Sequence, residues 1–209
     1  MMMQHRTFTG QLIGVAKDGD QDRAERLTRL RQCCESGLPM RWFAARVMTG
    51  REKAVENQLA GLGVEAIVPM RKGPDRRQRG RVVEGVLMPV IHGYVLVNMP
   101  ISGVLLAGLT GVEYFLSVVG GYDCPMPITP EEVRRFKALA EDGAFDWDKQ
   151  TGKRFSRGDQ VKIWDGPFVG FSGEVVSCRS DGRGDVVVTL DMLGGKVPVT
   201  VPLAICDKL

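Results

Sequence analysis

The segment HGYVLVNM, residues 92–99, is apolar on both of the faces that a β-strand would present. Tyr94 and Leu96 would point to one side of an extended chain, while Val95 and Val97 would point to the other side. A strand of this kind is typical of the centre of a sheet that helices cover on at least one face. The segment therefore predicts a layered fold with this strand in the middle of its sheet.

The sequence around this strand alternates between strand and helix patterns. Strand patterns occupy residues 41–48, 64–69, 81–88 and 112–119, and helical patterns occupy residues 49–63, 102–109 and 127–142. We expect Thr49 to cap the first of these helices, and Thr129 followed by Pro130 predicts a strong start for the last one. This order predicts an α+β domain, an antiparallel sheet with flanking helices.

The chain changes character near residue 141. Residues 143–154 are polar and lack a sustained period, which is typical of a linker. Beyond them, short valine-rich strands separated by glycine turns cover residues 159–164, 173–178, 185–192 and 196–203. Strands so short and so closely spaced predict a small antiparallel β-barrel of the SH3-like kind.

These patterns divide the chain into four parts. The predicted parts are an extension over residues 1–40, a first domain over 41–142, a linker over 143–154 and the barrel over 155–209. The extension is expected to be partly helical or disordered. Within it, Asp22 with Arg26 and Glu25 with Arg29 have helical spacing, which favours a solvated helix over residues 21–35.

The cysteine and histidine content argues against a metalloprotein and against an enzyme. The five cysteines are scattered without a CxxC pair, and His5 and His92 are the two histidines. These residues are too few for a zinc site or a histidine-based catalytic triad, and the thiols are expected to be reduced, as in a cytosol. No apolar run approaches the roughly 20 residues that span a bilayer. We expect a cytoplasmic, monomeric protein without catalytic residues, metal or cofactor.

The positive charge gathers in one loop, although the net charge of the chain is only +3. Residues 70–81, MRKGPDRRQRGR, contain one acid, Asp75, and six cations: Arg71, Lys72, Arg76, Arg77, Arg79 and Arg81. Residues 153–209, by contrast, hold eight basic and seven acidic side chains. Arginine suits phosphate oxygens because of its planar fork, so any nucleic-acid contact belongs to this loop. The alternative is a solvated hairpin tip.

Several motifs resemble those of the NusG family of transcription factors, in the order in which that family has them. The stretch RWFAARVMTGREKAVENQL resembles the opening of the NusG amino-terminal (NGN) domain, and HGYVLV resembles its sheet centre. VEYFLSVVGG followed by PITPEEV resembles its last strand and last helix. GDQVKIWDGPFVGFSGEV is similar to the KOW motif of the carboxy-terminal domain. Together these motifs cover residues 41–209, which makes the resemblance far more specific than one short motif.

The resemblance implies an elongation or antitermination factor with two binding domains. The NGN domain would hold the clamp coiled coil of RNA polymerase, and the KOW domain would recruit Rho or the ribosomal protein NusE. The positions that match the clamp pocket are Trp42, Phe43, Val90, Ile91, Tyr94 and Phe115. The KOW partner site would include Ile163, Phe168 and Phe171, with Phe168 exposed at the rim. The basic loop would lie beside upstream or non-template DNA.

Two alternatives remain open at this stage. The residue 1–40 extension, the Arg-rich loop and the sequence Val90-Ile91-His92 differ from the plainest family pattern, which favours a specialised paralogue over a general factor. A free-standing RNA- or ribosome-binding SH3-like module is the other reading, and the near-neutral charge of residues 153–209 counts against it. Whether the two domains pack on each other is not decided by the sequence.

Overall fold

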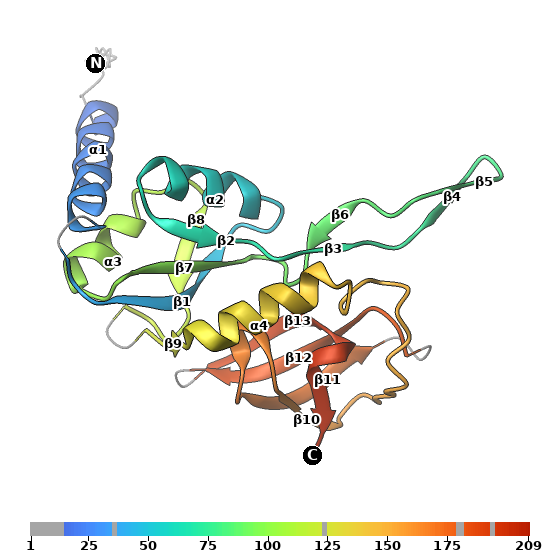
Figure 1. The fold of residues 1–209 in the computed structure, drawn as a ribbon. Coiled ribbons are helices and arrows are strands. Elements are labelled where there is room, and N and C mark those ends of the chain that lie inside the picture. The colour runs from blue at the N-terminus through green and yellow to red at the C-terminus, as the bar shows by residue number, and fades with distance from the viewer. Residues whose placement is uncertain (1–14, 35–36, 123–124, 179–181, 193–194) are drawn as a thin grey trace, which may run out of the picture.

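An α+β domain and an all-β domain lie directly against each other (Figure 1). The structure is a computed structural model that describes residues 15–34, 37–122, 125–178, 182–192 and 195–209. His5 and Cys124 lie outside the described residues. Figure 1 also shows a long hairpin arm that projects away from the body of the molecule.

The sheet of the amino-terminal domain is antiparallel throughout. Its strands follow the order β2 (Glu65–Ile67), β7 (Tyr94–Pro100), β1 (Met40–Val47) and β8 (Phe115–Val118), and β9 (Pro127–Ile128) also pairs with β1. The predicted doubly apolar strand is β7, and it lies between β2 and β1 as its sequence indicates. The mixed α+β character with an antiparallel sheet is therefore confirmed.

Helices cover both faces of this sheet. The helices are α1 (Val15–Cys34), α2 (Glu52–Gly61), α3 (Gly103–Leu109) and α4 (Pro130–Glu141). Alternate residues of β1 and β7 serve opposite faces. Phe43 and Val97 pack with α1, α2 and α3, whereas Ala44 and Leu96 face α4. Figure 1 shows α4 between the sheet and the carboxy-terminal domain.

The predicted start of α4 is confirmed, and that of α2 is wrong. At α4, the Thr129 hydroxyl accepts a hydrogen bond from the backbone N–H of Glu132, and the Glu132 carboxylate accepts one from the N–H of Thr129. At α2, the residue before the helix is Arg51, which makes no capping bond. Thr49 lies two residues before the cap position, and Gly50, with φ of +82°, turns the chain between them.

The amino-terminal extension forms a longer and better packed helix than its charge pattern predicts. Leu30 is fully buried, so α1 is not a solvated helix on this side. The Arg23 guanidinium donates a hydrogen bond to the Gly111 carbonyl, 2.9 Å away, just beyond the end of α3. The predicted Glu25–Arg29 pair is present, while Arg26 instead donates to the Thr110 hydroxyl. α1 therefore covers the outer side of α3.

The hairpin arm is a two-stranded ribbon built in two steps. Near the body, β3 (Met70–Lys72) pairs with β6 (Leu87–Pro89), and farther out β4 (Arg76–Gln78) pairs with β5 (Arg81–Val83). The strand predicted over residues 81–88 is thus interrupted between β5 and β6. Arg79 and Gly80 form the two-residue tip with φ of +50° and +77°, a backbone that a two-residue hairpin turn requires.

The carboxy-terminal domain is a five-stranded antiparallel sheet. Its strand order is β13 (Gly195–Pro202), β12 (Asp185–Met192), β11 (Ser172–Cys178), β10 (Gln160–Ile163) and β14 (Cys206–Lys208). Two 3₁₀ turns, η1 (Gly166–Phe168) and η2 (Leu203–Ile205), lie between strands. Among the described residues, the pairing follows this open order and does not join β13 to β14. The four strands that the sequence pattern predicts are present, β14 adds a fifth, and a closed SH3-like barrel stays a prediction.

The segment predicted as a linker has no helix or strand but is held in place. Phe145 is buried, and the Asp146 carboxylate accepts a hydrogen bond of 2.8 Å from the backbone N–H of Lys72 in the arm. The Trp147 N–H donates to the Lys72 carbonyl, and Thr151 donates to the Gly182 carbonyl of the carboxy-terminal domain. Residues 145–151 therefore connect the two domains through contacts as well as through the chain.

Cys206 is expected to resist alkylation in the folded protein. Burial raises the pKa of the Cys206 thiol to about 12, so at pH 8 the thiol stays protonated, and only the thiolate reacts. Peptide mass spectrometry after iodoacetamide treatment should show label on half-buried Cys178 in buffer, and on Cys206 only in urea. Equal labelling of both residues in buffer would contradict the buried position of Cys206.

Candidate functional site at the domain interface

Four of the six side chains predicted for the clamp pocket lie together on one face of the amino-terminal sheet. Trp42, Val90, Ile91 and Tyr94 are between 1% and 8% exposed and belong to one apolar cluster with buried residues of the carboxy-terminal domain. We call these four residues the docking face. The face is apolar, and the carboxy-terminal domain covers it.

Phe43 and Phe115 do not belong to the docking face. Phe43 is fully buried in the opposite cluster, under α1, α2 and α3, and Phe115 packs at the margin of that cluster. Neighbouring residues of a strand point to opposite faces, so Trp42 and Phe43 cannot serve the same surface. Their grouping in the sequence prediction is corrected here, since aromatic content alone does not reveal which face a residue takes.

Phe168 is buried against the docking face, which corrects the prediction that it is exposed. Its ring meets the ring of Tyr94 edge to face, with the centroids 4.9 Å apart, and no part of Phe168 is exposed. Gly166 allows this approach, because a Cβ there would lie 3.0 Å from the Phe136 ring of α4. Ile163 is also fully buried, and Phe171 is half-buried beside Phe168. The predicted partner site of one domain therefore covers the predicted partner site of the other.

Arg71 joins the two domains and is not available to nucleic acid in this arrangement. Its side chain is 0% exposed, and its guanidinium donates to the Asp185 carboxylate of β12 at 2.7 Å and to the Phe145 carbonyl at 3.3 Å. The Trp147 ring lies against the same guanidinium, 5.6 Å away. Arg71 Nε and the second Asp185 oxygen are both buried without a partner. The assignment of Arg71 to the basic nucleic-acid loop is therefore corrected.

A second ion pair crosses the interface at its edge. The Arg135 guanidinium of α4 donates to both oxygens of Asp165, each at 3.2 Å. Asp165 is fully buried and also accepts a hydrogen bond from the Gly166 N–H, and its carboxylate raises the pKa of Arg135. Half of the Arg135 side chain is exposed, so solvent weakens this pair relative to the buried one. The sequence shows Asp165 as a turn residue but gives no sign of its partner.

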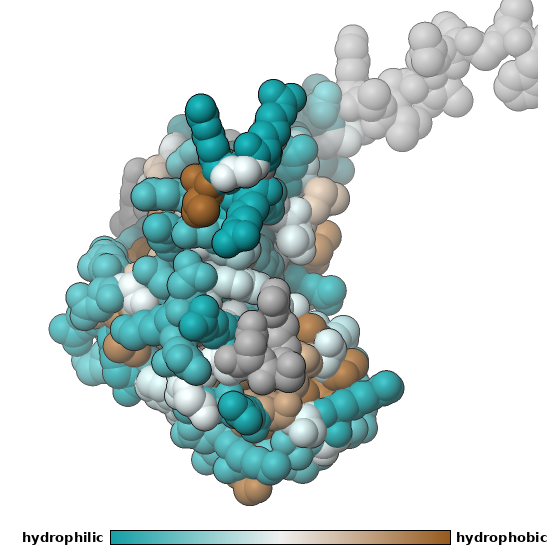
Figure 2. Space-filling view, turned by 90° about the vertical axis from the view of Figure 1, so that its right-hand side faces the viewer, coloured by the Kyte–Doolittle hydropathy of each residue, from teal (hydrophilic) through white to brown (hydrophobic). Residues whose placement is uncertain are grey.

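The tip of the arm carries the exposed part of the basic loop. Arg76, Arg77, Arg79 and Arg81 are all exposed, and Lys72 is half-buried at the base. No carboxylate of the described residues forms an ion pair with the four tip arginines. Apolar side chains are exposed beside them, with Val82 at 64% and Val86 at 80%. Figure 2, seen from the side toward which the arm points, shows mostly hydrophilic side chains with apolar ones among them.

Within the described ranges, no three His, Cys, Asp or Glu side chains are grouped so as to hold a metal ion. No helix there is both long enough and apolar enough to cross a membrane. The interface and the arm thus remain the candidate functional surfaces.

Comparison with known proteins gives consistent results. The family model described as "Transcription termination factor nusG" matches residues 40–137. A Treponema pallidum protein named "Transcription termination/antitermination protein NusG" is 29% identical over 186 residues, covering 80% of this chain and 98% of that protein. Proteins of the same name from Thermus thermophilus and Bacillus subtilis are each 26% identical, covering 78% and 80% of this chain and 95% and 98% of theirs.

Among solved structures, one described as "Domain interaction in Thermotoga maritima NusG" is similar at 24% identity. It covers 82% of this chain and 98% of that chain, with a TM-score of 0.40.

The fold and the interface define a class of protein: a two-domain protein in which an α+β domain and an all-β domain cover each other's apolar surfaces. The family model matches the first domain, and the relatives extend over most of both domains. Residues 40–137 are therefore NusG-like, and the similarity to proteins named NusG extends over about 80% of the chain.

Proposed function

We propose that this protein is a transcription termination or antitermination factor that binds RNA polymerase through the docking face. The observation that supports this most is that an apolar surface on the NusG-like domain is covered by a separate domain and not by its own core. The clamp coiled coil would take the place of the carboxy-terminal domain on Trp42, Val90, Ile91 and Tyr94. Exposed apolar patches of this kind are typical of partner sites.

The carboxy-terminal domain, in this proposal, recruits a second protein once it is released. Ile163, Phe168 and Phe171 would form its contact, with Phe168 as the aromatic anchor. Rho and the ribosomal protein NusE are the two candidate partners. Because the same aromatic side chain packs on Tyr94 in the closed arrangement, polymerase binding and partner recruitment would both require the domains to separate.

A pair of variants with opposite effects tests polymerase binding. Phe168→Ala removes the ring that covers Tyr94 and so weakens the hold of the carboxy-terminal domain on the docking face. Because that domain then competes less strongly with RNA polymerase, the affinity of the full chain for polymerase is expected to rise about tenfold or more. Ile91→Glu places a charge on the docking face and should abolish binding at micromolar concentrations. Both are measured by interferometry on immobilised polymerase. Unchanged affinity in both variants would reject the docking face as the polymerase site.

We also propose that the arm contacts the phosphate backbone of DNA near the polymerase. Changing Arg76, Arg77, Arg79 and Arg81 to glutamine should reduce the salt dependence of DNA binding, with the magnitude of the slope of log K against log salt falling by up to about 3.6. Fluorescence anisotropy with duplex DNA measures the slope. The control changes four other exposed cations to glutamine: Lys149, Arg154, Arg157 and Lys196. An equal loss in the control would mean that net charge acts and not the arm.

The protein is further proposed to be a specialised paralogue and not the general factor. The family model begins at residue 40, so α1 lies outside it, and four arginines crowd the arm tip. Transcript mapping after deletion distinguishes the two roles: changes confined to a few operons support specialisation, and a genome-wide change in pausing and termination contradicts it.

A further inference from the structure

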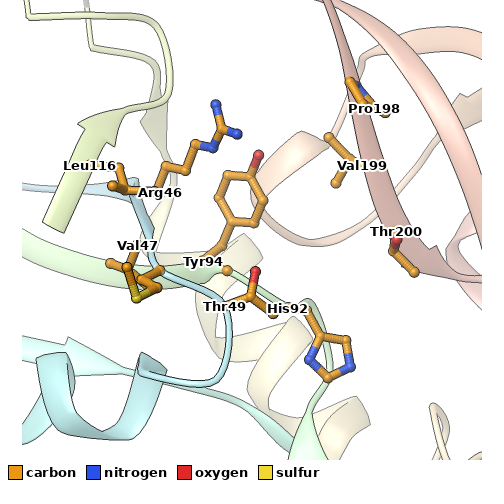
Figure 3. A pocket seen from close by; sticks show the side chains of 11 residues that line it. Arg46, Val47, Thr49, His92, Tyr94, Leu116, Pro198, Val199 and Thr200 are labelled. Atoms are coloured by element: carbon orange, nitrogen blue, oxygen red, sulfur yellow. The ribbon is translucent and has the colours of Figure 1, made fainter. Parts of the chain in front are cut away.

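A cavity of about 690 Å³ lies where the two domains meet, beside the docking face, with which it shares Tyr94. The amino-terminal domain supplies one wall, through residues 46–49, residues 92–94 and Leu116, and β13 supplies the other wall through residues 198–200. Figure 3 shows the side chains of Arg46 and Tyr94 extending into the space that faces Pro198, Val199 and Thr200, with Thr49 and His92 below them. Its volume lies in the range of small-molecule sites in proteins, about 300–1,000 Å³.

The polar groups around this cavity are basic or neutral. Arg46 contributes a guanidinium and His92 an imidazole, the hydroxyl groups come from Thr49, Tyr94 and Thr200, and no carboxylate lines the cavity. Among the residues that the structure describes, neither the Arg46 guanidinium nor the His92 ring has a hydrogen-bond or ion-pair partner. A carboxylate does lie nearby: Glu52 is buried and accepts a hydrogen bond of 2.6 Å from the Gly93 N–H. The Glu52 carboxylate is thus hydrogen-bonded to the backbone and forms no ion pair with Arg46.

Arg46 lies at the border between the two domains. It lines both this cavity and a smaller one of about 120 Å³, whose wall includes Met192 and Val197 of the carboxy-terminal domain. Arg46 remains exposed at this border between the domains, and among the described residues no carboxylate pairs with its guanidinium. An arginine fork placed beside hydroxyl groups is suited to a phosphate group. The apolar part of the wall, Tyr94, Leu116 and Val199, is suited to a flat ring.

We propose that this cavity binds a small phosphorylated metabolite of nucleotide size, with Arg46 on the phosphate group and hydroxyls from both domains around it. Thr200 belongs to the carboxy-terminal domain, so the complete site exists only while the domains are closed. A ligand that binds one of two conformations shifts the population toward that conformation. The metabolite would therefore hold the protein closed. This consequence for transcription rests on the proposed function, whereas binding itself does not.

Nuclear magnetic resonance on the full chain tests the site directly. Titration with GDP, without Mg²⁺, should shift the amide signals of Thr49, Gly93 and Thr200 together, whereas guanosine, which lacks phosphate, should bind at least tenfold more weakly. Inorganic phosphate should shift the same signals at higher concentration. Equal binding of guanosine and GDP, or no shift with any of the three probes, would overturn the proposal. Stronger binding of a single-stranded oligonucleotide at these signals would overturn it in favour of nucleic acid.

Matched variants separate this site from general electrostatics. Arg46→Gln should weaken GDP binding about tenfold or more, because it removes the charged donor, and Thr200→Val should weaken it severalfold from the other domain. Arg134→Gln, on the exposed side of α4, is the control and should leave binding unchanged. If Arg134→Gln weakens binding as much as Arg46→Gln, the site is not the cavity.

The consequence for closure has its own measurement. With GDP at about ten times its dissociation constant, the apparent affinity for RNA polymerase should fall about tenfold, and the Arg46→Gln variant should lose this effect. Polymerase that binds without any effect of GDP would disprove the regulatory consequence and leave the polymerase site intact. A protein that binds GDP but never binds polymerase would disprove the proposed function and leave the cavity site intact.

Discussion

Replacing Arg71 with methionine is expected to separate the two domains while each domain stays folded. Removing one member of a buried ion pair costs about 3–5 kcal/mol because the other charge is left without compensation. Asp185 is only 13% exposed in the closed protein, and separation of the domains would return it to water. The closed population should therefore fall about a hundredfold or more relative to the open one. Backbone ¹⁵N relaxation, which distinguishes joint from independent tumbling of the domains, measures this.

A second substitution at the same pair shows whether the charge or the shape is responsible. Arg71→Met combined with Asp185→Leu should restore closure to at least the original level, because Arg71 Nε and one Asp185 oxygen already lack partners. Arg135→Met, at the half-exposed pair, is the matched comparison and should change the closed population only severalfold. A double variant as open as Arg71→Met alone would show that the methionine disturbs packing, contrary to this account.

Replacing Phe43 with alanine is expected to destabilise the amino-terminal domain by about 3–5 kcal/mol. Phe43 is fully buried between the sheet and the helices, so truncation leaves a cavity in the core. A loss of that size is a large share of the 5–15 kcal/mol that is usual for a domain. Urea unfolding, followed by a spectroscopic probe in the amino-terminal domain, measures this loss of unfolding free energy.

The adjacent residue supplies the control for this prediction. Trp42→Ala removes a larger side chain, but from the docking face, where α4 and the carboxy-terminal domain cover it. Its effect on unfolding should be smaller than that of Phe43→Ala, and its effect on domain closure larger. If the order of the two effects is reversed, the assignment of these neighbours to opposite faces is wrong.

The sequence predicts the elements of this fold better than their contacts. The doubly apolar residues 94–97 define the central strand, and Thr129 with Pro130 defines the start of α4, because these signals depend on local chemistry. The start of α2 was misplaced because Gly50 allows a turn that takes Thr49 away from the helix. Strands and helix caps can be predicted because they depend on neighbouring residues. The path of a turn depends also on the surrounding structure.

The candidate site was predicted in part, and the missing part is long-range. Trp42, Val90, Ile91 and Tyr94 come together as the resemblance implies, but the burial of Phe168 depends on where the other domain sits. Arg71 is indistinguishable from its basic neighbours in the sequence, since its partner Asp185 lies 114 residues away. Contacts between domains leave little trace in local composition. A buried arginine within a charged loop is identified only by its three-dimensional partner.

The segment of residues 145–151 determines how far the carboxy-terminal domain can travel when it opens. Asp146 and Trp147 are bound to the backbone of Lys72, and β10 begins only at Gln160. If these bonds persist, the free tether of residues 148–159 spans at most about 40 Å. A domain on so short a tether has an effective local concentration of the order of millimolar at its own docking face. Under the proposed function, polymerase would compete with this tethered domain for the docking face. Breaking the two Lys72 bonds would lengthen the tether and lower the effective local concentration of the domain.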